Sequence, residues 1–229
     1  MKNLAVILAR SGSKGLRDKN IKLLDGKPLL VYSIEAACDS KIFDCVHVST
    51  DSPQYANLAE KYGADVPFLR SEELASDYAN SWDAIEEVLE KYAAIGHFFD
   101  MVTLLQPTSP LRAAQDIISA YSMFQFPEVK AIVSVCEMDH SPLWSNILPA
   151  DYSMENFQRL DSFEARQKMD IYYRINGAIY MIDRKFLQEN HKIYRKGCYA
   201  YVMSKERSID IDTQLDFDIA EFLLRRKNL

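Results

Sequence analysis

Two rhythms of apolar and polar residues alternate along this chain of 229 residues. Short, nearly continuous apolar runs are typical of strands that are covered on both faces of a sheet. Stretches whose apolar residues recur three or four positions apart are typical of helices that pack one face on such a sheet. The two kinds of segment follow one another over most of the chain, so the pattern predicts alternating strands and helices.

The apolar runs predict strands at residues 4–9, 46–49, 66–69, 101–105, 131–136, 177–182 and 199–203. The helical spacing predicts helices at residues 28–38, 52–62, 81–92, 113–124 and 215–224. Pro28 suits the opening of a helix, and Gly63 suits the end of one. This order predicts an α/β fold with a doubly wound, mainly parallel sheet and right-handed crossovers.

The rhythm breaks between residues 137 and 174, where polar residues, prolines and aromatic residues mix without a clear period. Irregular stretches of this length are uncommon in a compact domain unless they have a function. We therefore expect residues 137–174 to form an arm that lines a site or crosses to another subunit. The remaining pattern is continuous, and residues 1–229 are predicted to form a single domain with a full core.

Composition narrows the function classes. The net charge of −6 argues against nucleic acid or an anionic membrane as the main partner. The apolar run before Arg10 is too short for a signal peptide, and no run approaches the length of a membrane span. The four cysteines lack a C-x-x-C pair, which indicates reduced thiols and predicts a cytoplasmic protein.

The first apolar run ends in a basic, glycine-bearing turn that contains Arg10, Lys14, Arg17, Lys19 and Lys22. Small residues let its backbone turn tightly and present N–H groups; they are Ser11, Gly12, Ser13 and Gly15. α/β proteins bind polyphosphates with such a turn after a buried strand. The spacing matches neither a Walker A loop nor a dinucleotide fingerprint. The alternative interpretation is a solvated basic turn after an edge strand.

A pair of aspartates, Asp210 and Asp212, precedes the last predicted helix. Residues two apart in extended backbone point the same way, so the two carboxylates are expected on one side. Two carboxylates suit Mg²⁺, which takes its remaining ligands from waters and substrate phosphates. In the alternative interpretation Asp212 only caps the helix and Asp210 is simply exposed.

Two further segments carry polar groups next to predicted strands. Gln106, Thr108, Ser109 and Arg112 follow a buried strand, at the edge where doubly wound sheets bind ligands. Their amide and hydroxyl groups suit a sugar or a ribose, although a rigid proline turn explains the same residues. Arg174 and Asn176, two apart before a strand, are candidates for pairing with a carboxylate. The alternative for Arg174 is an ordinary surface arginine.

Several blocks in a fixed order resemble the acylneuraminate cytidylyltransferases. They are residues 9–15 with 19–20, 49–51, 69–70 with 74–77, 105–112, 174 with 176–178, and 208–213. The resemblance runs from residue 4 to the final helix. It implies a Rossmann-like nucleotidyltransferase that couples CTP to a nine-carbon α-keto acid sugar of the sialic, legionaminic or pseudaminic acid type. The products are the CMP-sugar, a precursor for cell-surface polysaccharides, and pyrophosphate.

The resemblance also implies roles for individual residues. Nucleotide binding falls to Arg10, Ser13, Lys14, Gly15, Asn20, Arg70 and Ser81, and sugar binding to Gln106, Thr108, Arg174 and Asn176. Mg²⁺ is expected on Asp210 and Asp212, and catalysis is expected to depend on Arg10, Lys19 and Asp212. The family is typically a homodimer, which fits residues 137–174 as a dimerisation arm. The rival hypotheses are a 3-deoxy-octulosonate cytidylyltransferase and a non-catalytic sugar-binding homologue.

Two departures from the family pattern bear on the sugar. Members that use sialic acid often carry a lysine where this chain has Trp144, and commonly a proline where it has Ile175. A flat, bulky indole suits apolar or acetamido groups. This favours a deoxygenated, diacetamido sugar such as legionaminic or pseudaminic acid. The sequence leaves open the general base and the number of metal ions.

Overall fold

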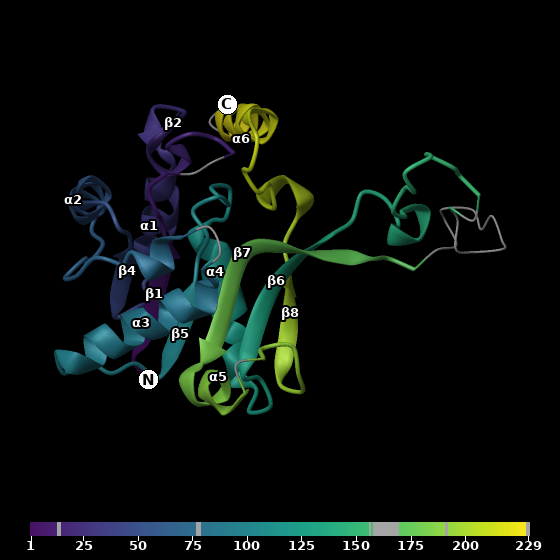
Figure 1. The fold of residues 1–229 in the computed structure, drawn as a ribbon. Helices are drawn as coiled ribbons and strands as arrows, with labels where there is room; N and C mark the ends of the chain where they lie inside the picture. The colour runs from purple at the N-terminus through teal and green to yellow at the C-terminus, as the bar shows by residue number, and fades with distance from the viewer. Residues whose placement is uncertain (13–14, 77–78, 156, 158–169, 191, 228–229) are drawn as a thin grey trace.

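The computed structural model describes residues 1–229 except 13–14, 77–78, 156, 158–169, 191 and 228–229. A six-stranded sheet in the order β4-β1-β5-β7-β6-β8 forms the centre (Figure 1). Its strands are β1 (Asn3–Leu8), β4 (Cys45–Ser49), β5 (Met101–Leu104), β6 (Ala131–Glu137), β7 (Tyr173–Asp183) and β8 (Cys198–Val202). β1 is parallel to β4 and β5, and β6 to β8, whereas β7 is antiparallel to both of its neighbours. The predicted mainly parallel sheet is confirmed.

Helices cover both faces of this sheet. They are α1 (Leu29–Ser40), α2 (Pro53–Lys61), α3 (Ser81–Ala94), α4 (Ala114–Ser122), α5 (Arg184–Asn190) and α6 (Gln214–Lys227). Short 3-10 helices lie at η1 (Lys19–Ile21), η2 (Glu73–Ala75), η3 (Met123–Gln125), η4 (Pro142–Trp144) and η6 (Lys205–Arg207). Along β1, Ala5 and Ile7 pack with residues of α1, α2 and α4, whereas Leu4 and Val6 pack with α3 and α5. This alternation makes the sheet doubly wound, as predicted.

The strand predicted at residues 66–69 is wrong. These residues are described, and in this region only Asp65 bridges to β4, at His47. Val66 packs in the cluster on the α1 face and Phe68 in the cluster on the α3 face. The segment therefore wraps around the edge strand instead of pairing with it, and Pro67 lacks the N–H that a ladder needs.

The C-terminal segment packs against the residues that follow β1. A small hairpin, β2 (Leu23–Leu24) with β3 (Lys27–Pro28), shares an apolar cluster with α6, formed by Leu24, Leu29, Leu111, Ile211, Phe217 and Ala220. Lys22 Nζ lies 4.8 Å above the centre of the Phe217 ring. These contacts place the residues just before α6 beside the basic turn.

Between the ends of β6 and β7, the described residues of the stretch 137–174 extend away from the other elements (Figure 1). The two strands stay paired as far as Glu137 and Tyr173. In the described part of this stretch, Ile147, Tyr152 and Met154 are largely exposed. The assignment of 137–174 as an arm that joins two subunits stays a prediction. Among the described helices, none is long and apolar enough to cross a membrane.

Candidate active site

A cavity of about 510 Å³ opens beside the carboxyl ends of β1 and β5. This is where doubly wound sheets bind ligands. The structure brings nine of the predicted residues to its wall: Arg10, Gly15, Lys19, Asn20, Arg70, Ser81, Gln106, Thr108 and Asp212. Ser13 and Lys14, which were also predicted to bind the nucleotide, lie outside the described residues.

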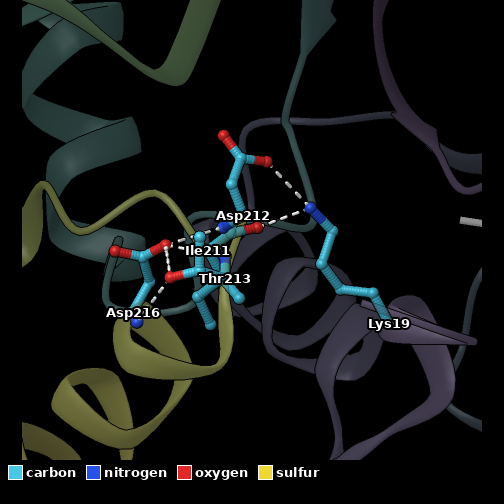
Figure 2. A network of polar contacts seen from close by, with 5 residues as sticks. All are labelled: Lys19, Ile211, Asp212, Thr213 and Asp216. Carbon is cyan, nitrogen blue, oxygen red and sulfur yellow. Dashed lines mark hydrogen bonds and ion pairs between the residues drawn. The ribbon is translucent and has the colours of Figure 1, made fainter. Parts of the chain in front are cut away.

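The basic turn meets Asp212 at the cavity, where the side chains of Lys19 and Asp212 point toward each other (Figure 2). Lys19 Nζ donates to Asp212 Oδ1 at 3.0 Å and to the carbonyl oxygen of Ile211 at 2.5 Å. A Cβ on Gly15 would lie 3.1 Å from the carbonyl oxygen of Asp212, so the close approach of the two backbones favours glycine here. These two segments, distant in the sequence, therefore lie side by side.

Asp212 does not cap α6. Thr213 precedes the helix, and its backbone N–H donates to Asp216 Oδ2 at 2.7 Å while the Asp216 N–H returns a hydrogen bond to the Thr213 hydroxyl (Figure 2). This reciprocal pair satisfies the first turn of the helix. The side chain of Asp212 is 76% exposed and is held by Lys19. The capping alternative is therefore wrong for Asp212, and its carboxylate is accessible to a ligand.

Asp210 and Asp212 flank Ile211, whose buried side chain packs in the cluster below α6. Burial raises the pKa of Asp210, and the nearby charge of Asp212 raises it further, although the Thr108 hydroxyl and Lys19 act in the opposite direction. Paired hard carboxylates with mutual repulsion fit Mg²⁺. No third carboxylate, histidine or cysteine completes a metal-ligating group among the described residues. Mg²⁺ would thus take its other ligands from substrate and water.

Arg70 follows β4 in the sequence and also lines the cavity. It is 9% exposed, and it donates from Nε to Ser49 Oγ at 2.9 Å and from Nη2 to the Ser49 carbonyl at 2.6 Å. Burial lowers the pKa of Arg70 to about 10, so the guanidinium remains charged at neutral pH. Ser81 lines the cavity where α3 begins. Together with Arg10 and Lys19, Arg70 makes this wall suitable for an anionic ligand.

Gln106 and Thr108 lie on a turn that is held by hydrogen bonds from buried side chains. The Ser33 hydroxyl donates to the Gln106 carbonyl at 3.2 Å and itself accepts from Arg112 Nη2 at 2.6 Å. Arg112 is 2% exposed and also donates to the Ala178 carbonyl at 3.2 Å. Placing Arg112 and Ser109 at the ligand edge was wrong, since both are buried beneath the turn.

Arg174 and Asn176 do not line the cavity. Arg174 donates to the carbonyl of Ser208 at 3.1 Å, and Asn176, 1% exposed, donates to the Ser208 hydroxyl at 2.8 Å. Asn176 also accepts from the Ser134 hydroxyl at 2.6 Å. These bonds tie β7 to the segment that carries the aspartate pair. Direct contact of either residue with a sugar stays a prediction.

Asn20 and Asp51 hold the start of the basic turn. Asn20 is 5% exposed, and its amide donates to the carbonyl of Arg10 at 3.0 Å. Asp51, which sequence reasoning gave no role, accepts two hydrogen bonds from Ser11. The available signal was its position directly after β4, since neighbouring parallel strands end at the same edge.

The fold is that of a Rossmann-like nucleotidyltransferase, and its cavity is lined by the cations Arg10, Lys19 and Arg70 and by the carboxylate of Asp212. The family model described as Cytidylyltransferase matches residues 4–225, and the chain belongs to this family. It is 41% identical over 228 residues to an N-acylneuraminate cytidylyltransferase of Escherichia coli O18:K1:H7, covering 99% of this chain and 53% of the relative. The chain thus spans about half of that relative's length.

Two shorter relatives match along nearly their whole length. A CMP-N,N'-diacetyllegionaminic acid synthase of Legionella pneumophila is 37% identical, with 98% of this chain and 97% of the relative covered. A pseudaminic acid cytidylyltransferase of Campylobacter jejuni is 32% identical, with the same coverage. The structure of a CMP:2-keto-3-deoxy-manno-octonic acid synthetase complexed with CTP superposes with a TM-score of 0.74 at 17% identity, covering 99% of this chain and 100% of that one. At this low identity, the structural similarity to the synthetase shows the fold alone.

Proposed function

We propose that this protein is a Mg²⁺-dependent cytidylyltransferase that joins CTP to a nine-carbon α-keto acid sugar and releases pyrophosphate. The contact between Lys19 and Asp212 supports this proposal most, because a cation suited to phosphate and a carboxylate suited to a metal ion lie together at the cavity. The names of the relatives, which refer to sialic, legionaminic and pseudaminic acids, support the substrate class.

The proposed reaction is an in-line displacement at the α-phosphorus of CTP. The C2 hydroxyl oxygen of the sugar forms the new bond to phosphorus, the bond to the β-phosphate oxygen breaks, and the hydroxyl proton is lost. Phosphoryl and nucleotidyl transfers depend on positioning and on charge neutralisation. Arg10 and Lys19 would neutralise the leaving pyrophosphate, and Arg70 and Ser81 would hold the cytidine. Mg²⁺ on Asp210 and Asp212 would supply further charge neutralisation at the phosphates.

The sugar would occupy the side of the cavity that Gln106 and Thr108 line. We propose a diacetamido sugar of the legionaminic or pseudaminic type as the preferred acceptor, with Trp144 against an acetamido group. Trp144 belongs to the described part of residues 137–174 and is 38% exposed in a single chain. A homodimer in which this arm closes the partner's cavity would bring the indole to the sugar. Because CTP is a cytoplasmic nucleotide, we place the reaction in the cytoplasm.

Pyrophosphate release tests the proposal directly. The protein is incubated with CTP, Mg²⁺ and, in parallel, N-acetylneuraminic, diacetyllegionaminic, pseudaminic and 3-deoxy-octulosonic acids. We expect turnover with the nine-carbon acids, a preference for a diacetamido sugar, and none with chelator present or with UTP replacing CTP. Turnover restricted to the eight-carbon acid would establish the rival enzyme. Binding without turnover of any sugar would establish the non-catalytic homologue.

A further inference from the structure

Both carboxylate oxygens of Asp51 accept hydrogen bonds from the same residue, Ser11. Ser11 donates to them through its backbone N–H, at 2.7 Å, and through its hydroxyl, at 2.6 Å. Leu8 and Ser49 are paired neighbours at the ends of β1 and β4, so Ser11 and Asp51 lie just beyond two adjacent strand ends. Hydrogen bonds to an ionised group are stronger than those between neutral groups, so this double contact holds the loop firmly.

The presence of the Asp51 carboxylate next to a cationic cavity needs a physical explanation. The neighbouring cavity wall carries Arg10, Lys19 and Arg70, and a negative charge beside them weakens the attraction for any anionic ligand. Partial burial raises the pKa of Asp51, but the hydrogen bonds from Ser11 and the nearby Arg70 charge outweigh this and leave the pKa below its usual value. Asp51 is therefore ionised at neutral pH, and its charge is directed at the Ser11 donors.

The two ends of one peptide group are held at the same time. The carbonyl between Arg10 and Ser11 accepts from the Asn20 amide at 3.0 Å, and the N–H of the same peptide donates to Asp51. Rotation of this peptide plane would break both contacts. The next residue, Gly12, has φ of +70°, a conformation that glycine adopts readily, so the fixed peptide plane leads directly into a left-handed backbone position.

We propose that Asp51 is a positioning residue that fixes the Arg10–Ser11 peptide plane and so orients the basic turn for the triphosphate. The proposal rests on the proposed function for the identity of the ligand. Asp51 would act through the turn and touch no substrate. Its loss should therefore weaken the use of CTP and leave the use of the sugar nearly unchanged.

The experiment compares Asp51→Ala with Asp51→Asn. The alanine variant loses both contacts, and we expect hydrogen exchange of the amides at residues 10–12 to speed up about tenfold and the KM for CTP to rise about tenfold. The sugar KM should stay within about twofold, by the same argument. The asparagine variant can accept from the Ser11 N–H and donate to its hydroxyl, so it should recover most of the CTP affinity.

Asp44→Ala is the matched control. Asp44 Oδ2 accepts the N–H of Asn3 at 2.7 Å, at the opposite end of the same strand pair and away from the cavity. This variant should lose stability to a similar extent while the KM for CTP stays at the wild-type value. If Asp44→Ala and Asp51→Ala raise both substrate KM values alike, Asp51 has only a structural role and the proposal is overturned.

The remaining outcomes separate the two proposals. Unchanged amide exchange in Asp51→Ala overturns the positioning role, whatever the activity. Faster exchange with an unchanged CTP KM overturns it as well, because the turn would then not need the fixed peptide plane. A wild-type protein that turns over no CTP overturns the proposed function and the CTP step of this inference, while the exchange measurement still decides whether Asp51 holds the turn.

Discussion

The two sides of the cavity differ in how completely one chain builds them. On the side proposed to bind the nucleotide (the nucleotide side), hydrogen bonds within the chain already position Lys19, Arg70 and Asp212. On the side proposed to bind the sugar (the sugar side), Gln106 and Thr108 line the cavity, but Arg174 and Asn176 bond to Ser208. Trp144 lies in η4, within the stretch 137–174. For the proposed reaction, this difference predicts that a single chain binds the phosphates and that sugar selection needs groups from a second copy.

The largest effect is expected at the nucleotide side, from Asp212→Ala. The exposed carboxylate contributes little to stability, but its loss removes a proposed metal ligand and the partner of Lys19. We expect turnover to fall by about a thousandfold or more with little change in Tm. Pyrophosphate release and thermal unfolding measure both, and Asp218→Ala, on the exposed side of α6, is the control. An Asp212→Ala variant that keeps most of its turnover would contradict the metal assignment.

Gly177→Ala should show whether the sugar side depends on Gln106. Gly177 has φ of +76°, and a Cβ there would clash with Oε1 of Gln106, whose backbone is fixed by Ser33. We expect kcat/KM for the sugar to fall about a hundredfold, with a smaller change for CTP. In a Gln106→Ala background the substitution should add little to that loss. A full additional loss there would show that backbone strain at Gly177, and not the Gln106 side chain, is responsible.

The fold as a whole should also lose stability in acid, through the buried His47 on β4. Burial lowers the pKa of His47 from 6.5 to about 4. The unfolded chain takes up a proton below pH 6.5 and the folded chain does not until about pH 4. Stability therefore falls as the pH drops through this window, by about 2 kcal/mol between pH 7.5 and pH 5.

Urea unfolding at several pH values measures this slope. His47→Asn can keep the hydrogen bond that the ring makes with the Asp65 carbonyl at 2.9 Å and cannot titrate. Its unfolding free energy should be lower overall and should depend less on pH. A slope equal to that of the wild type would assign the acid sensitivity to other groups.

The smallest effect is expected for Trp144→Ala, which tests the sugar side from the arm. Loss of one aromatic contact should raise the KM for a diacetamido sugar about fivefold and leave the KM for CTP unchanged. Substitution of the exposed Tyr152 by alanine is the control on the same stretch. If Trp144→Ala leaves every sugar KM unchanged, the arm does not select the acceptor.

The sequence was most informative where periodicity is strong. The run predicted at residues 4–9 is β1 (Asn3–Leu8), and the helix predicted at 81–92 is α3 (Ser81–Ala94). The strand at 66–69 failed because apolar residues that wrap an edge show the same alternation as a strand. The short helix α5 (Arg184–Asn190) offers too few apolar positions to establish a period.

The sequence could predict those parts of the candidate site whose position follows from the order of the strands alone. Residues that follow β1 and β5 had to lie at one edge, and most of those predicted there line the cavity. Asn176 shows the limit, since a polar residue at a strand entrance can face a ligand or another segment. The role of Asp51 depends on the pairing of Leu8 with Ser49, and no local pattern specifies that register.

The Lys19–Asp212 contact joins residues 193 positions apart. During synthesis the central strands can begin to assemble as soon as they leave the ribosome. The contact between Lys19 and Asp212 cannot form until the segment that contains Asp212 has been translated. Such distant pairings form slowly. The enzyme is thus expected to gain its catalytic competence as one of the final events of folding, after most of the sheet is in place.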